Sequence, residues 1–342
     1  MKISQFVTTS VLVLSLILAG CGKTETVNKS DDKKNQDTVT VYTTIYPLED
    51  FTKKIGGEFV DVQSIYPPNV DAHTFEPSQK DMVSLANSDL FIYTGVGLEG
   101  FADKAAEALK KEDVQIVKAA DGIELLETED EHHHGEGESE SEQHEDENGH
   151  SEEDTHKDSE AHEDHADGDL DPHVWLDPVL SIDLAKNIKN ALSKQMPERT
   201  AEFESNFNQL KDELEKLDQE FKTTIESSKT RNILVAHAAY GYWEKRYGIE
   251  EIAISGLSPT QEPSQKELQA IIEESAEHNI HYVIFEQNVS PKIAKIIQEE
   301  IGAKSLTLHN LEAITEENIK QKDDYFSIMR KNLETIKTVL NN

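Results

Sequence analysis

The sequence predicts an α/β protein of two (β/α) lobes with parallel-rich sheets, joined by a long helix, with a metal site in the cleft between the lobes. Three observations support this prediction. Short β-branched segments alternate with amphipathic segments on both sides of the chain's middle, as in parallel β/α units. One long amphipathic segment separates the two alternating regions. Four short motifs containing histidine or glutamate stand at the predicted strand ends or in loops.

The first alternating region covers about 80 residues before a polar interruption. Strands are predicted at residues 39–45, 59–65, 90–93 and 114–117, and helices at residues 47–56, from residue 78 onward, and at 101–109. Pro47 opens the first helix and Gly56 and Gly57 end it, which is the usual asymmetry of helix ends. Ser78 followed by Asp81 forms a rough capping box at the start of the second.

The middle of the chain is predicted to be helical. Two stretches, residues 181–195 and 198–227, are separated at Pro197. The second carries one apolar stripe with a spacing of three and four residues, made of Phe203, Phe207, Leu210, Leu214, Leu217, Phe221 and Ile225. At 1.5 Å per residue this helix spans roughly 45 Å, enough to lie along two lobes.

The second alternating region resembles the first in layout, without an obvious sequence repeat. Strands are predicted at residues 232–236, 252–255, 282–285 and 305–308, and helices at 240–247, 264–278, 291–301 and 325–340. We therefore divide the chain into a signal peptide (1–20), a tether (21–37), an N-terminal lobe (38–180), a helical segment that includes the linking helix (181–228) and a C-terminal lobe (229–342).

The N-terminus has the pattern of an exported lipoprotein. Lys2 and an apolar stretch at residues 11–18 make a secretory signal peptide, too short for a membrane span of roughly 20 residues. Cys21, the only cysteine, follows Leu18-Ala19-Gly20 in a sequence that resembles the lipobox of bacterial lipoproteins. We expect Cys21 to carry the lipid and to hold the protein on the extracytoplasmic side of the cell membrane through a polar tether. A generic signal peptide with an incidental cysteine is the alternative.

A polar segment at residues 127–169 interrupts the N-terminal lobe. It contains His132, His133, His134, His144, His150, His156, His162 and His165 among many carboxylates, and it has no large apolar residues to form a core. We expect a disordered auxiliary loop that binds metal weakly, because imidazole is a good ligand for zinc and similar ions. The alternatives are a plain acidic spacer or a chance histidine tract.

The formal net charge of −35, more than half of it from this segment, argues against nucleic acid or anionic membrane surfaces as partners. The same charge favours cationic ligands.

The candidate metal ligands are His73, His173, His237 and Glu286. His237 and Glu286 each follow directly on an apolar strand, and ligands of open α/β sheets bind at the carboxyl ends of strands. His73 and His173 lie in loops of the first lobe, where they can face the other two across a cleft. Three imidazoles and one carboxylate make a good tetrahedral set for Zn²⁺.

Each of these residues also has an ordinary structural interpretation. An isolated histidine after a strand is often a hydrogen-bonded core residue, and a glutamate there is often a cap or a surface charge. We expect His278, His281 and His309 to be structural. The acidic residues of the motifs either orient the imidazoles or make turns and caps, and the sequence favours neither; they are Asp71, Asp171, Asp177 and Glu76.

Together the motifs resemble those of the zinc-binding lipoproteins of the cluster A-I metal-receptor family, the solute-binding subunits of zinc ABC importers of ZnuA or AdcA type. Residues 71–77, 171–178, 236–242 and 285–286 are similar to its four ligand motifs, and an acidic histidine-rich insertion is typical of its zinc members. The resemblance extends from residue 39 to the C-terminus. It implies two lobes bridged by a rigid helix, one buried zinc ion, a membrane permease as partner and no catalysed reaction. We expect a monomer.

Three other functions are weighed against a zinc receptor. Manganese receptors of this family replace one histidine by a carboxylate, whereas this chain keeps His237, so zinc is favoured. A surface adhesin or passive zinc buffer would also suit a lipoprotein with an acidic loop. A zinc hydrolase, with Glu286 as general base, is disfavoured because the chain has neither a His-Glu-x-x-His helix nor a nucleophile elbow.

Overall fold

Two four-stranded parallel sheets with the same topology form the framework of the protein. The computed structural model describes residues 38–127, 170–287 and 291–342. The first sheet has the order β2-β1-β3-β4, with β1 (Val39–Thr43), β2 (Val60–Ser64), β3 (Leu90–Tyr93) and β4 (Gln115–Lys118). The second has the order β10-β9-β7-β8, with β7 (Asn232–His237), β8 (Glu250–Ser255), β9 (Tyr282–Glu286) and β10 (Lys304–Leu308). In both, all pairings are parallel, and the first strand lies between the second and the third, which confirms the predicted α/β class.

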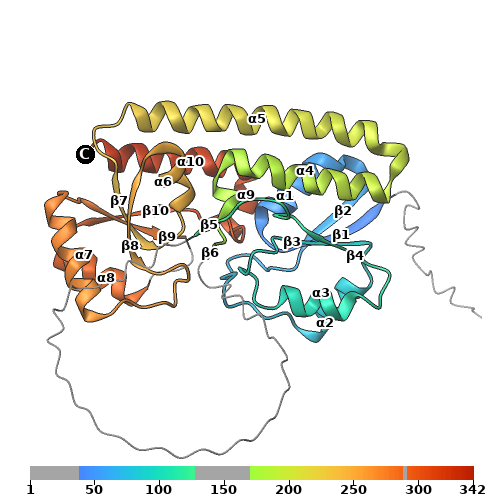
Figure 1. Ribbon diagram of the computed structural model, residues 1–342, viewed down its shortest axis with the longest axis horizontal. Coiled ribbons are helices and arrows are strands. Elements are labelled where there is room, and N and C mark those ends of the chain that lie inside the picture. The colour runs from blue at the N-terminus through green and yellow to red at the C-terminus, as the bar shows by residue number, and fades with distance from the viewer. Residues whose placement is uncertain (1–37, 128–169, 288–290) are drawn as a thin grey trace, which may run out of the picture. The chain divides into compact units, whose positions relative to one another are not determined.

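Helices connect the parallel strands and cover the sheets (Figure 1). They are α1 (Tyr46–Gly56), α2 (Gln79–Ala86), α3 (Ala102–Leu109), α4 (Pro178–Gln195), α5 (Thr200–Glu226), α6 (Gly241–Tyr247), α7 (Gln265–Glu277), α8 (Lys292–Glu300), α9 (Glu316–Gln321) and α10 (Tyr325–Leu340). Most elements lie within a few residues of the predicted ranges. The sequence did not predict α9 or the short antiparallel pair of β5 (Leu126–Glu127) and β6 (Leu170–Asp171).

Local sequence signals explain where several helices begin and end. Pro47 occupies the first turn of α1, and Gly57, with φ of 55°, ends it in a conformation that favours glycine. Ser78 and Asp81 form the predicted capping box of α2, each side chain satisfying a backbone N–H of the other.

The long helix α5 passes both sheets (Figure 1). All seven apolar residues of its predicted stripe are buried. They pack against α1 and α4 on the side of the first sheet and against α6 and α10 on the side of the second. At 1.5 Å per residue its 27 residues extend about 40 Å, so one helix holds elements of both halves of the fold.

A single hydrophobic core connects the two sheets. It contains Val41 and Phe91 of the first sheet together with Val235 and Ile284 of the second. The opposite face of the second sheet forms a separate cluster with α7 and α8, through residues such as Ile271 and Ile297. Because close-packed cores resist deformation, the shared core fixes the carboxyl ends of both sheets relative to each other.

None of the helices within the described ranges combines the length and apolar character that crossing a membrane requires.

Candidate metal centre

Four side chains with metal-binding atoms, three of them buried and that of His73 partly buried, meet where the two sheets face each other. They are His73 in the connection from β2 to α2, His173 between β6 and α4, His237 at the end of β7, and Glu312 in the connection from β10 to α9. One nitrogen or oxygen of each lies within 4.8 Å of the others. Three of the four follow a strand of a parallel sheet, and in open α/β sheets ligands bind at these carboxyl ends.

The spacing of the donor atoms suits a tetrahedral ion. His73 Nε2 lies 3.3 Å from Glu312 Oε1, and His173 Nε2 lies 3.9 Å from the same oxygen. The Nε2 atoms of His173 and His237 are 3.5 Å apart. Ligands at 2.0–2.1 Å from a tetrahedral zinc ion are about 3.3 Å from one another. The four atoms can therefore hold such an ion after small adjustments.

The site is buried, and its carboxylates and imidazoles shift one another's pKa. His173, His237 and Glu312 are at most 3% exposed. Although burial alone would raise the pKa of Glu312, the imidazoles of His73, His237 and His173 hold it at about 2. Burial would likewise lower the pKa of His237, but Glu286 and Glu312 raise it to about 9. Glu312 is thus ionised, and a metal must displace a proton from His237.

The structure corrects the prediction of Glu286 as the fourth donor. Glu286 is buried at the end of β9, but its Oε1 lies 2.5 Å from Nδ1 of His237, the ring nitrogen that points away from the other donors. Glu312 takes the predicted place instead. Since β9 and β10 are adjacent and parallel, both carboxylates follow strand ends at the same sheet edge. The chain after β10 brings Glu312 to the Nε2 atoms of His73 and His173, whereas Glu286 reaches only the Nδ1 side of His237.

A short, well-bonded loop places Glu312. Leu311 has a φ of 61°, a left-handed conformation that is uncommon for a residue other than glycine, and it turns the chain back toward the site. The N–H groups of Leu311 and Glu312 donate to His309 Nδ1 at 2.9 Å and to Asn310 Oδ1 at 3.2 Å. Glu312 Oε2 accepts a hydrogen bond from the Ala72 N–H at 3.3 Å. The polar residues directly after the predicted strand at 305–308 were the available sequence signal for this loop.

The Asp171 carboxylate orients His173. Asp171 Oδ1 lies 2.8 Å from His173 Nδ1 and also accepts the His173 backbone N–H at 2.9 Å. With its proton on Nδ1, the imidazole leaves the Nε2 lone pair free for a metal. Of the two roles that the sequence left open for the acidic residues, Asp171 therefore has that of orienting an imidazole.

The other acidic residues of the motifs have turn and cap roles. Asp71 accepts the His73 backbone N–H at 2.9 Å and the Thr74 hydroxyl at 3.1 Å, as in a turn. Asp177 caps α4 and lies 2.5 Å from Arg246 Nε. Glu76 is exposed.

The histidines that we expected to be structural lie outside the metal-binding group. His309 is buried, accepts the Leu311 N–H at Nδ1 and contacts Asn318 Oδ1 through Nε2 at 3.0 Å. Burial lowers its pKa to about 4, so the ring is neutral. His278 and His281 are exposed near the start of β9. Cys21 and the eight histidines of the 127–169 segment lie outside the described residues.

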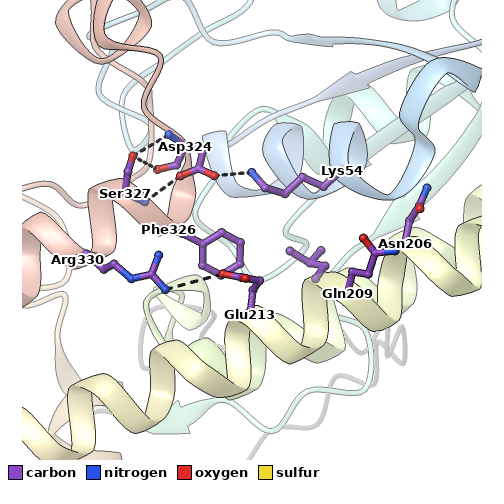
Figure 2. Close-up of a pocket in the computed structure, with 9 residues that line it drawn as sticks. Lys54, Asn206, Gln209, Glu213, Asp324, Phe326, Ser327 and Arg330 are labelled. Carbon is purple, nitrogen blue, oxygen red and sulfur yellow. Dashed lines mark hydrogen bonds and ion pairs between the residues drawn. The ribbon is translucent and has the colours of Figure 1, made fainter.

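A separate cavity of about 380 Å³ lies between α1, α5 and α10 (Figure 2). Its charged side chains pair with one another: Lys54 with Asp324 at 3.1 Å and Arg330 with Glu213 at 3.8 Å. Such internal pairing leaves no concentrated charge for a metal ion, so the four-residue cluster is the better candidate.

Residues 41–339 match the protein family described as zinc-uptake complex component A, periplasmic. The chain is 35% identical to the high-affinity zinc uptake system protein ZnuA of Bacillus subtilis (strain 168) over 326 residues, covering 95% of this chain and 94% of the relative. It is 33% identical to the zinc-binding lipoprotein AdcA of Streptococcus pneumoniae (strain R6) over 328 residues. That match covers 95% of this chain but only 60% of the longer relative.

Solved structures show the same architecture. The Zn(II)-bound ZnuA-like domain of Streptococcus pneumoniae AdcA is 30% identical, with a TM-score of 0.68, over 89% of this chain and 100% of that domain. The laminin-binding protein Lmb of Streptococcus agalactiae, described as a bifunctional protein with adhesin and metal-transporting activity, is 29% identical with a TM-score of 0.72. It is matched over 89% of this chain and 100% of its own length.

Proposed function

Because the chain belongs to the family of zinc-uptake complex component A, we propose that it is the extracytoplasmic receptor that captures Zn²⁺ for an ABC importer. The family is one of solute-binding transport proteins, which confirms the prediction that the chain is not an enzyme. The observation that carries the proposal is the convergence of three imidazoles and one carboxylate in a buried site. Zinc is the substrate of the protein, held until it is handed on.

The proposed ligands are Nε2 of His73, His173 and His237 with one oxygen of Glu312. Nitrogen-rich tetrahedral sets favour zinc, whereas manganese prefers six oxygen donors, so a manganese receptor is the weaker alternative. Four protein donors also leave no open position for the activated water that a zinc hydrolase needs.

The partner and the location follow from the same proposal. We assign the release of zinc to a membrane permease of the importer. We also assign anchoring to a lipid on Cys21, with residues 21–37 as the tether. Residues 38–180 and 229–342 then form the two lobes, and residues 181–228 link them.

Competition titration against a zinc chelator tests the site. His73→Ala and His237→Ala each remove one donor and are expected to weaken zinc binding at least about tenfold, or about 1.4 kcal/mol. His278→Ala, at an exposed histidine outside the cluster, is the matched control and should bind as the unchanged protein does. Unchanged affinity in the double variant of His73 and His237 would refute the assignment.

A further inference from the structure

A second buried carboxylate, that of Glu286, stands directly behind His237. It is only 7% exposed, and a buried charge is costly unless it is paired. We propose that Glu286, held in place by Asn310, positions His237 for the metal and so determines how tightly and how selectively the site binds zinc. This inference rests on the proposed function and assigns Glu286 the part of a positioning residue.

The two ring nitrogens of His237 face different groups. Nε2 points to the other donors, 3.5 Å from His173 Nε2, while Nδ1 lies 2.5 Å from Glu286 Oε1. The contact lacks the direction of a regular hydrogen bond, and neither atom has another such partner among the described residues. With its proton shared between Nδ1 and the carboxylate, His237 offers the Nε2 lone pair to the metal.

Asn310 fixes the other end of Glu286. Its amide nitrogen donates to Glu286 Oε2 at 3.0 Å, and its amide oxygen accepts the Glu312 N–H at 3.2 Å. The same oxygen accepts a hydrogen bond from Gln287 Nε2 at 2.9 Å. These donors require the oxygen where it is, so the amide hydrogens must face Glu286. Asn310 thereby links the carboxylate behind His237 to the backbone of the ligand Glu312.

The Asn310 backbone extends the network to the first half of the fold. Its carbonyl oxygen accepts the indole N–H of Trp175, two residues after His173, at 2.7 Å. His173 itself has an analogous carboxylate, Asp171, on its Nδ1. Two of the three imidazoles are therefore backed by carboxylates, an arrangement that orients the ring and makes it a stronger donor.

The charges explain how this arrangement affects selectivity. A zinc ion with the Glu312 carboxylate carries a net charge of +1, and the carboxylates of Glu286 and Asp171 lie close enough to stabilise it. Glu286 is also bound to His237 and Asn310, so its oxygens are not free to coordinate. An ion that requires oxygen donors therefore gains no ligand from Glu286. An ion that favours imidazole gains, because Glu286 makes His237 a better nitrogen ligand.

The test compares Glu286→Gln and Glu286→Asp with Glu312→Gln, using chelator competition for zinc and the visible spectrum of the cobalt-substituted protein. Glu286→Gln brings amide hydrogens toward either His237 or Asn310, so it is expected to weaken zinc binding about 10- to 100-fold. It should nevertheless keep a tetrahedral cobalt spectrum with a shifted band. Glu286→Asp keeps the charge and should recover part of the affinity. Glu312→Gln should lose the tetrahedral spectrum.

Glu99→Gln is the matched control, because Glu99 is a buried carboxylate bonded to Thr44 and Thr94 in the first half of the fold. It should bind zinc as the unchanged protein does. Zinc affinity of Glu286→Gln within twofold of the unchanged protein would overturn the inference. So would loss of its tetrahedral cobalt spectrum, which would make Glu286 a direct ligand.

Two further results distinguish a failure of the Glu286 role from a failure of the proposed zinc-receptor function. Absence of tight zinc binding in the unchanged protein would refute the proposed function itself. If Glu286→Gln does not fold by circular dichroism, Asn310→Ala removes the support of Glu286, together with the acceptor of the Glu312 N–H, without touching His237. That variant is expected to lose zinc affinity about tenfold and to keep the tetrahedral cobalt spectrum, and unchanged affinity would overturn the inference.

Discussion

The hydroxyl of Tyr242 donates a hydrogen bond to the backbone carbonyl of Asp171 at 2.7 Å, and so ties the helix after His237 to the strand before His173. Two more side chains of α6 reach the same segment: the Trp243 indole donates to the Leu176 carbonyl at 2.6 Å, and Arg246 pairs with Asp177. The two histidines are therefore held by one rigid connection before any metal binds, which reduces the ordering cost of binding.

Tyr242→Phe is expected to reduce both the free energy of unfolding and zinc affinity. The change leaves the buried Asp171 carbonyl without this partner, at a cost of about 1–2 kcal/mol, and it loosens His173, which should weaken zinc binding a few-fold. Denaturant unfolding of the zinc-free protein and chelator competition measure the two effects. Tyr247→Phe, on the same helix, removes a hydrogen bond to Asp218 in α5 and should lower stability alone. Equal zinc affinity in both variants would show that the Tyr242 connection does not support the site.

Zinc binding at pH 7.5 is expected to release about one proton. The metal-free protein carries a proton on His237, whose pKa of about 9 exceeds this pH, while Glu312, with a pKa of about 2, is already ionised. Zinc must displace the proton, so apparent affinity should rise about tenfold per pH unit up to about pH 9. Calorimetry in two buffers of different protonation enthalpy counts the protons. If no proton were released, His237 would be neutral in the metal-free protein at this pH, which would contradict the prediction.

His309 is expected to make the zinc-free protein sensitive to acid. Its folded pKa of about 4 lies below the usual value of about 6.5, so the unfolded chain binds the proton first. The neutral His309 ring contributes its full share to the free energy of unfolding above pH 6.5, and this contribution is lost as pH falls toward 4. At pH 5 the loss is about 2 kcal/mol. His309→Gln cannot titrate, so its unfolding free energy should fall about 2 kcal/mol less between pH 7 and pH 5. Parallel pH profiles of the two proteins would contradict this assignment.

Cys21→Ala is expected to release the protein from the membrane fraction. Cys21 is the only cysteine in the chain, and it directly follows Leu18-Ala19-Gly20, the position in which a lipid acceptor is expected. Cell fractionation with immunodetection measures the distribution, with Ser10→Ala in the signal segment as a control that keeps Cys21. Retention of the Cys21 variant in washed membranes would show that another feature anchors the protein.

Deleting residues 131–166 is expected to leave one tight zinc ion bound and to remove several weak ones. The deletion removes all eight histidines of the acidic segment but keeps six residues to connect β5 and β6, whose ends pair at Glu127 and Leu170. Since the composition of this segment offers no large apolar residues for a core, we expect its histidines to lose conformational freedom on binding, which lowers their affinity. Calorimetry counts both classes of site. Loss of the tight event would mean that the segment supplies an essential ligand.

The sequence alone determined the order and type of most elements. Alternating β-branched and amphipathic segments predicted both sheets, and the spacing from Phe203 to Ile225 predicted the buried stripe of α5, because these signals depend on neighbours within a few residues. The three histidine motifs were likewise visible, since each combines a histidine with local turn residues.

Only the tertiary structure decided between the two carboxylates. Glu286 and Glu312 both follow strands of one sheet, and a glutamate at a strand end looks the same in sequence whether it meets a metal or the back of an imidazole. The left-handed turn at Leu311 and the Glu312 N–H bond that Asn310 accepts bring Glu312 to the donors. The bond that Asn310 donates to Glu286 holds that carboxylate behind His237. The loop that carries Glu312 is itself held by contacts between segments far apart in the chain, of Asn310 with Glu286 and Trp175 and of Glu312 with Ala72. Local sequence patterns do not encode such contacts.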